Sequence, residues 1–302
     1  MVEHPVPSLI RKRWPWLVGI AGALAGAILL VVLIVPPRMG SWERIRREGV
    51  IRIGYAVEAP YAFLDARGEP TGLEVDVARS VAANLKIPGM DWIQTDFALL
   101  LSELEEGRFD AVAAGVFITP ERAKRALFSE PTFRVRQALL VRAGNPRRLH
   151  AYEDMRGNEG TRIAVLHGSI EEGMVRDMGV PRDRVIVVPD VLTGRTAVET
   201  GLADGLALSL PTVRNMALRQ MLGLTEAAEP FAQPSRPGVR FMGYGAVVFR
   251  KTDHSLCREW NRGLKAFIGS EEHLRLLVRY GLTTADLPGN VTTSTILASG
   301  AE

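Results

Sequence analysis

The sequence predicts an α/β fold, arranged as two successive units behind one N-terminal membrane segment. Strands and helices alternate from residue 50 onward, and the pattern restarts near residue 161 as a second unit. An uncharged apolar run occupies residues 16–35. Without that run roughly 260 residues remain, which is enough for one large domain or two lobes.

The composition is that of an ordinary globular protein, with 24% charged and 47% hydrophobic residues. The formal net charge is +3, and basic and acidic residues are interspersed from residue 41 onward, so nucleic acid is not a predicted partner. The single cysteine, Cys257, excludes an internal disulfide and is expected to pack in a helix. The histidines show no metal-ligand spacing and no nucleotide-binding motif is present, so we expect no metal and no cofactor.

The run over 16–35 is long enough to cross a membrane. As a helix it would span about 30 Å, the thickness of one hydrocarbon core. Trp14 and Trp16 lie at its start, where aromatic residues suit the membrane interface. Pro36 and Pro37 end it. We therefore predict one transmembrane helix.

A cleavable signal peptide is the alternative for the same run. Its apolar region is typically about 7–15 residues long and ends in a small-residue cleavage pattern. The run here is longer, lacks that pattern and is followed by no cysteine that could carry a lipid. We favour a retained anchor between a segment over 1–15 and a linker over 36–48. Positive charges on its two sides are nearly balanced and do not orient it.

In the first unit, apolar strands are followed by helical patterns. The predicted strands cover 50–55, 90–94 and 111–117, and the predicted helices cover 72–85 and 97–107. Gly107 ends the second of these helices, as glycine often does. This alternation favours a sheet with covered faces.

The second unit repeats the alternation after a strand over 137–144. Its predicted strands are 161–166, 184–189 and 205–209, and its helices begin at Ser169, pass through 197–200 and cover 212–222. A strand over 243–250 and helices near 255–268 and 271–280 follow. We expect the domain to span 49–290 and the polar residues 291–302 to form a flexible tail.

An acid and three aromatic side chains follow strands of the first unit. Glu58 and Tyr61 come after the first strand, Phe97 begins the helix after the second, and Phe117 ends the third. In open α/β sheets, ligands collect at the carboxyl ends of the strands. Each phenylalanine alone is better explained by core packing, but three rings beside one acid favour a pocket.

A second motif, FITPER, ends a strand and opens a helix. Thr119 fits the N-cap and Pro120 the first helical position, so Arg122 lies in the first turn. A cation there opposes the helix dipole, whereas a bound anion would reverse the sign. The motif alone leaves two interpretations open: Arg122 holds a ligand carboxylate, or it pairs with Glu121 or Glu130.

Several motifs together resemble the polar amino-acid class of solute-binding proteins of ABC importers, known as solute-binding protein family 3. They are GVIRIGY, the G-x-x-T-G-L-E-V-D-V-A pattern over 68–78, EGRFDAVAAG over 106–115, ITPER over 118–122 and ALFSEPTF over 126–133. The resemblance covers residues 45–283. It implies a periplasmic-binding-protein-like type II fold, with two α/β lobes joined by crossing strands near 137–143 and 243–249.

The same resemblance implies boundaries and a location. The first lobe would cover about 49–138 and 246–290, and the second about 144–240. The binding domain would lie on the extracytoplasmic side of the inner membrane, with 1–15 in the cytoplasm. The implied partners are a small ligand and the permease and ATPase subunits of an ABC importer.

Within that family the sequence is most similar to ectoine- and hydroxyectoine-binding proteins, through YAVEAPYAF, TDF, GVFITPER, AGNP and GYGAVVFR. This resemblance implies an aromatic box of Tyr61, Phe97 and Phe117 around the ligand ring. It also implies that Glu58 meets the ligand cation and Arg122 its carboxylate. The further binding residues that we expect are Thr119, Ser169 and Ser209.

Two positions depart from ordinary amino-acid binders of the family. Phe117 stands where those proteins usually have a hydroxyl residue for the α-carboxylate. Ser209 stands where they usually have an aspartate for the α-amino group. The loss of that aspartate, together with the acid at Glu58, implies a ligand without a normal α-ammonium group.

We therefore predict a membrane-anchored binding protein that captures a small zwitterion by lobe closure for an ABC importer. Polar amino-acid binding and ligand sensing without transport are the alternatives. Dehydratases of similar build exist, but an enzyme would need an acid/base partner beyond Glu58. The sequence reveals none, so we expect no catalysis.

Overall fold

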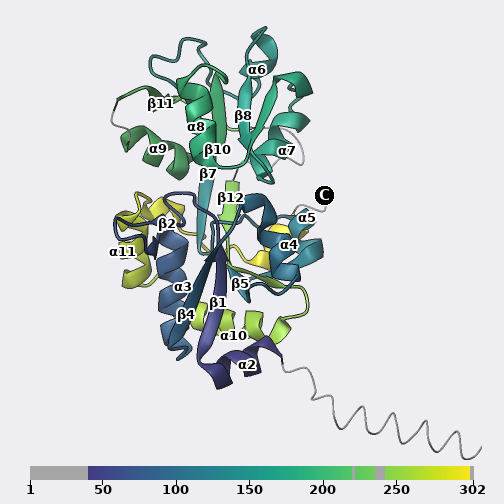
Figure 1. Ribbon diagram of the computed structural model, residues 1–302, viewed down its shortest axis with the longest axis vertical. Helices are drawn as coiled ribbons and strands as arrows, with labels where there is room; N and C mark the ends of the chain where they lie inside the picture. The colour runs from purple at the N-terminus through teal and green to yellow at the C-terminus, as the bar shows by residue number, and fades with distance from the viewer. Residues whose placement is uncertain (1–39, 220–221, 235–241, 300–302) are drawn as a thin grey trace, which may run out of the picture. The chain divides into compact units, whose positions relative to one another are not determined.

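The computed structural model describes residues 40–219, 222–234 and 242–299, and the described residues from Ser41 onward form one compact unit (Figure 1). The predicted membrane segment over 16–35 and the segment over 1–15 lie outside them. Among the described residues, no helix has both the length and the apolar character needed to cross a membrane.

The first lobe is built on a five-stranded sheet in the order β4-β1-β5-β13-β6. Its strands are β1 (Val50–Tyr55), β4 (Gly89–Gln94), β5 (Ala111–Val112), β6 (Ala126–Phe128) and β13 (Val248–Arg250). Strand β1 pairs in parallel with β4 and β5, so the carboxyl ends of these three strands share one edge. Its helices are α3 (Leu73–Asn84), η1 (Phe97–Leu99), α4 (Leu100–Glu105), α5 (Pro120–Arg125), α10 (His254–Lys265) and α11 (Glu271–Arg279).

The core of this lobe lies where α3 and α10 cover the sheet. Ile51 and Ile53 of β1 pack in one apolar cluster with Val77 of α3 and Trp260 of α10, and all four are fully buried. Cys257 of α10 is half-buried beside this cluster, as expected for a packed helix residue. A short hairpin, β2 (Phe63–Leu64) with β3 (Pro70–Thr71), and the turn η3 (Thr284–Asp286) complete the lobe.

The second lobe has its own sheet, in the order β11-β7-β10-β8-β9. Its strands are β7 (Phe133–Arg142), β8 (Ile163–Leu166), β9 (Val185–Val188), β10 (Gly205–Ser209) and β11 (Thr225–Ala227). Strands β8, β9 and β10 run parallel, so their carboxyl ends also share an edge. The helices are α6 (Asp154–Gly157), α7 (Ile170–Asp177), η2 (Arg182–Arg184), α8 (Val191–Glu199) and α9 (Leu210–Leu218).

Two strands connect the lobes, as the family resemblance implies. Strand β12 (Met242–Gly245) pairs with the first residues of β7 (Figure 1). Phe133 and Val135 at the start of β7 pack in the first lobe's core, whereas Leu139 and Val141 pack in the second lobe's core. The predicted strand over 243–250 is two strands, because β12 pairs with β7 while β13 belongs to the first sheet.

Helices also form in the expected linker and in the expected tail. Helix α2 (Ser41–Glu48) falls in the expected linker, yet its Ile45 is fully buried in the first lobe's core and its Arg44 pairs with buried Asp110. Helix α12 (Thr293–Ala298) falls in the expected tail. Thr292 caps it, Ile296 is buried, and Val291 and Leu297 pack against the same cluster, so apolar contacts fix a segment that composition alone marks as polar.

Candidate ligand-binding site

The carboxyl ends of β4, β1 and β5 bring the sequence-predicted residues of the first lobe together. Glu58 and Tyr61 follow β1, and Phe97 follows β4 as the first residue of η1. Phe117 follows β5 and forms a β-bridge with Gly245 of β12. The parallel pairing of the three strands thus places these loops at one sheet edge.

A small cavity lies at this edge. Its lining comes from both lobes: Glu58, Phe97, Gly115, Phe117 and Arg122 from the first, and Leu166, Ser169, Ile170, Glu171, Leu208 and Ser209 from the second. Gly115 has a positive φ of 69°, and a Cβ there would lie 2.6 Å from the Tyr61 ring, so only glycine fits. Mostly apolar walls with a few charged groups are typical of small-molecule sites.

Arg122 is held by neutral backbone groups. Its Nη1 donates to the carbonyl oxygen of Phe117 at 2.9 Å, and its Nη2 donates to that of Gly168 in the second lobe at 3.0 Å. The guanidinium lies 5.6 Å from the centre of the Phe97 ring. The two acids considered as ion-pair partners of Arg122 have other partners. Glu121 pairs with Lys124, and Glu130 accepts a hydrogen bond from the backbone N–H of Thr293.

A chain of hydrogen bonds joins Glu58 and Tyr61 of the first lobe to Thr212 and Ser209 of the second lobe. Thr212 donates its hydroxyl to Oε1 of Glu58 at 2.7 Å. The hydroxyls of Thr212 and Ser209 are 3.0 Å apart, and those of Ser209 and Tyr61 are 2.8 Å apart. All four side chains are buried. The acid in the cavity is therefore oriented by the second lobe.

Tyr61 and Thr119 do not line the cavity. The Tyr61 ring is 1% exposed and stacks on Phe133, with ring centres 4.9 Å apart, so it supports the site from the core. Thr119 caps α5 by accepting from the Arg122 backbone at 3.2 Å, and it lines an adjacent open groove. The other six predicted residues all line the cavity.

Burial changes the charge behaviour of the site. It raises the pKa of Glu58 to about 7; Thr212 opposes this rise, the nearby carboxylate of Glu171 adds to it, and Arg122 opposes it. Burial also raises the pKa of Glu171. It lowers the pKa of Arg122 to about 10, against the opposing effect of Glu171 and then Glu58, so Arg122 stays positively charged at neutral pH.

The sequence reasoning missed two functional candidates, Glu171 and Thr212. Both lie in the first turn of a helix that follows a parallel strand of the second lobe, α7 after β8 and α9 after β10. The sheet-edge rule used for the first lobe would have found them. Among the described residues, no cluster of potential ligands could hold a metal ion.

The arrangement suits a small molecule that carries both a carboxylate and a cation. The hydrogen bonds to the carbonyl oxygens of Phe117 and Gly168 use two of the five N–H groups of Arg122. The other three N–H groups have no hydrogen-bond partner among the described residues. Glu58 supplies a negative charge in the same cavity, and the rings of Phe97 and Phe117 supply apolar walls.

Known proteins resemble this chain in both sequence and fold. A probable amino-acid ABC transporter periplasmic-binding protein of Sinorhizobium fredii is 34% identical over 266 residues, covering 86% of this chain and 87% of the relative. A cyclohexadienyl dehydratase of Pseudomonas aeruginosa is 26% identical, over 60% of this chain and 67% of its own length. The crystal structure of EhuB in complex with hydroxyectoine superimposes with a TM-score of 0.77 and 27% identity, over 85% of this chain and 97% of that one.

The model of one family matches residues 51–283, which include both lobes and the strands between them. This match agrees with the resemblance read from the motifs and with the two-lobed architecture. The chain belongs to the bacterial extracellular solute-binding proteins, family 3.

Proposed function

We propose that this protein captures a small zwitterion, with ectoine and hydroxyectoine as the candidates, and delivers it to the permease and ATPase of an ABC importer. One observation carries the proposal: Arg122, with unused N–H groups, and Glu58 line the same small cavity as the rings of Phe97 and Phe117. Arg122 would hold the ligand carboxylate and Glu58 its cation.

The chemistry supplies enough affinity for a transport protein. A cation over a ring face contributes about 0.5–2 kcal/mol, and a desolvated arginine–carboxylate pair adds both energy and orientation. A micromolar dissociation constant needs only about 8 kcal/mol in total. Because the cavity walls come from both lobes, a bound ligand stabilises the closed arrangement that a permease would recognise.

The test is a thermal-shift screen of the full-length protein in detergent, followed by calorimetric titration of each hit. The panel contains ectoine, hydroxyectoine, glycine betaine, proline and the polar amino acids. We expect ectoine or hydroxyectoine to give the largest stabilisation. A polar amino acid that binds at least tenfold more tightly than both would replace the ectoines as the ligand.

We also propose that residues 16–35 anchor the protein in the inner membrane with its binding domain outside. The support is the length of the uncharged run in the sequence. After a salt wash the protein should remain with the membrane fraction and keep its N-terminus. A soluble form that begins near residues 38–42 would identify the run as a signal peptide.

A second candidate function is elimination chemistry on a small carboxylate. The observation that favours it is Glu171, which places a second acid in the cavity beside Glu58. The related dehydratase gives this candidate a precedent within the same fold. Nuclear magnetic resonance of each bound ligand after overnight incubation separates the two functions: a transport protein returns its ligand unchanged.

A further inference from the structure

Two carboxylic acids, one from each lobe, line the cavity. Glu58 comes from the loop after β1 and is 8% exposed; Glu171 comes from α7 and is 4% exposed. Among the described residues, neither forms an ion pair with Arg122, whose two bonds go to carbonyl oxygens. Fully ionised, the three groups would give the cavity one net negative charge.

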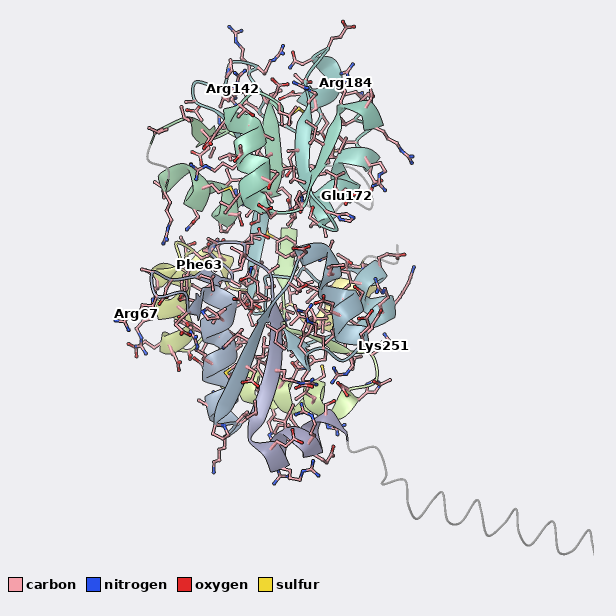
Figure 2. The ribbon with its side chains drawn as sticks, in the orientation of Figure 1. Phe63, Arg67, Arg142, Glu172, Arg184 and Lys251 are labelled. Carbon is pink, nitrogen blue, oxygen red and sulfur yellow. The ribbon has the colours of Figure 1, made fainter. Side chains whose placement is uncertain are left out.

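The carboxylate of Glu171 hydrogen-bonds with its own backbone N–H and with the side chains of Ser169 and Gln137, all of them neutral groups. Ser169 already accepts from the backbone N–H of Glu172 at 3.3 Å. Glu172, labelled in Figure 2, accepts from the backbone N–H of Gly168 at 3.0 Å. None of the groups hydrogen-bonded to Glu171 is a cation, and a buried carboxylate that only neutral groups contact is costly, so a cationic ligand would stabilise Glu171.

We infer that Glu171 and Glu58 accept N–H groups from the same ligand cation, so that the site selects a planar amidinium or guanidinium and rejects a quaternary ammonium. This inference rests on the proposed function and specifies the class of its ligand. Glu171 acts as a specificity-determining residue that touches the ligand from the second lobe.

Hydrogen-bond geometry explains the selection. A buried carboxylate needs donors, and each of these acids is an acceptor when ionised. An amidinium or guanidinium carries N–H groups on both sides of its central carbon, so it can meet two acids at once. A quaternary ammonium has positive charge but no N–H, so both acids would be desolvated without a hydrogen bond.

The experiment compares three carboxylate-bearing probes on the full-length protein by calorimetry. Ectoine carries an amidinium, arginine a guanidinium and glycine betaine a quaternary ammonium. We expect the wild type to bind ectoine or arginine at least roughly 30-fold more tightly than glycine betaine. Glu171→Gln should weaken binding of the tighter of these two probes by roughly 30-fold or more, which is typical of truncating a buried charge pair. It should leave the affinity for glycine betaine unchanged.

Glu121→Gln is the matched control, because Glu121 is an exposed acid next to Arg122 whose one ion pair within the described part of the chain is with Lys124. It should bind all three probes like the wild type. Titrations in two buffers of different ionisation enthalpy also count the protons exchanged on binding. A merely structural role for Glu171 would weaken all probes equally and leave the proton count unchanged, which would overturn the inference.

The remaining outcomes separate the inference from the proposed function. If Glu171→Gln binds ectoine like the wild type while Glu58→Gln loses it, the inference fails and the proposed function stands. Glycine betaine binding as tightly as the planar cations also overturns the inference. If none of the three probes binds the folded wild type, both fail. Unfolding of Glu171→Gln would assign Glu171 to the fold and overturn the inference as well.

Discussion

The hydroxyl of Thr212 in the second lobe donates a hydrogen bond of 2.7 Å to the carboxylate of Glu58 in the first lobe. Thr212 lies on α9 and Glu58 in the loop after β1, and both side chains are buried. The acid that we assign to the ligand cation is therefore also a contact between the lobes. Ligand recognition and lobe closure share this one carboxylate.

Thr212→Val should weaken ligand binding by about 10- to 100-fold. The change keeps the shape of the side chain and removes the donor, and a hydrogen bond to a charged group contributes about 1.5–3 kcal/mol. Calorimetric titration with the tightest ligand of the screen measures the effect. Thr196→Val on α8 is the control, because its hydroxyl only donates to the carbonyl of Leu192 in its own helix. Equal affinity of the wild type and Thr212→Val would contradict the assigned role of this bond.

Arg122→Lys should cost about 2–5 kcal/mol of binding free energy, or roughly 30- to several-thousand-fold in affinity. A lysine ammonium is a point charge and cannot keep two carbonyl bonds while it also holds a carboxylate in a bidentate fork. Calorimetry gives the affinity, and a melting curve checks the fold.

Arg125→Lys provides the comparison for that change, since Arg125 lies on the same helix and pairs with Glu105 at the surface. It should leave the affinity within about twofold of the wild type. Wild-type affinity in Arg122→Lys would show that the ligand does not contact this guanidinium.

Affinity for a cationic ligand should fall as the pH drops below about 7. Burial raises the pKa of Glu58 to about 7, and a bound cation lowers it again, so binding at acidic pH must first remove a proton. The loss approaches tenfold per pH unit for one linked proton. Titrations between pH 8 and pH 5.5 measure it, and Glu58→Gln should flatten the profile. A wild-type affinity that is constant over this range would contradict the linkage.

Sequence patterns were sufficient to predict most of the site residues that come from the first lobe. Glu58, Phe97 and Phe117 each follow an apolar strand, and parallel strands necessarily bring their carboxyl ends to one edge. Arg122 could be placed from its capping motif. The direction of the Tyr61 ring could not, because it depends on stacking against Phe133, a residue of a strand that crosses between the lobes.

The second-lobe half depends on how distant segments meet. The sheet-edge rule places Thr212 after β10 at the edge of its own lobe, but no local pattern predicts that it contacts Glu58 of the other lobe. The same holds for the C-terminal helix α12, where burial of Ile296 against the first lobe outweighs a polar composition. Tertiary packing, rather than local preference, decided each of these positions.

A buried acid outside the cavity controls stability rather than binding. Glu74 on α3 is fully buried, and its Oε1 accepts from Thr132 at 2.8 Å. Its Oε2 has no hydrogen-bond partner among the described residues. Burial raises the pKa of Glu74 to about 7, with the bond from Thr132 opposing the rise. Thr132 precedes β7, so this acid lies next to the strands that join the lobes.

Glu74 should make the folded protein less stable as the pH rises. Between about pH 4.5, the ordinary value, and pH 7 the folded state holds a proton on Glu74 that the unfolded state has lost. Its contribution to the free energy of unfolding therefore falls by about 3 kcal/mol across this window and is constant above it.

Glu74→Gln cannot ionise, so it should gain stability relative to the wild type as the pH rises from 5 to 8. Urea unfolding at both pH values measures the difference, and any fixed cost of the buried amide cancels between them. Glu69→Gln, a change of an exposed acid in the turn between β2 and β3, should show no such difference. The same stability difference between Glu74→Gln and the wild type at both pH values would show that Glu74 stays ionised in its buried position.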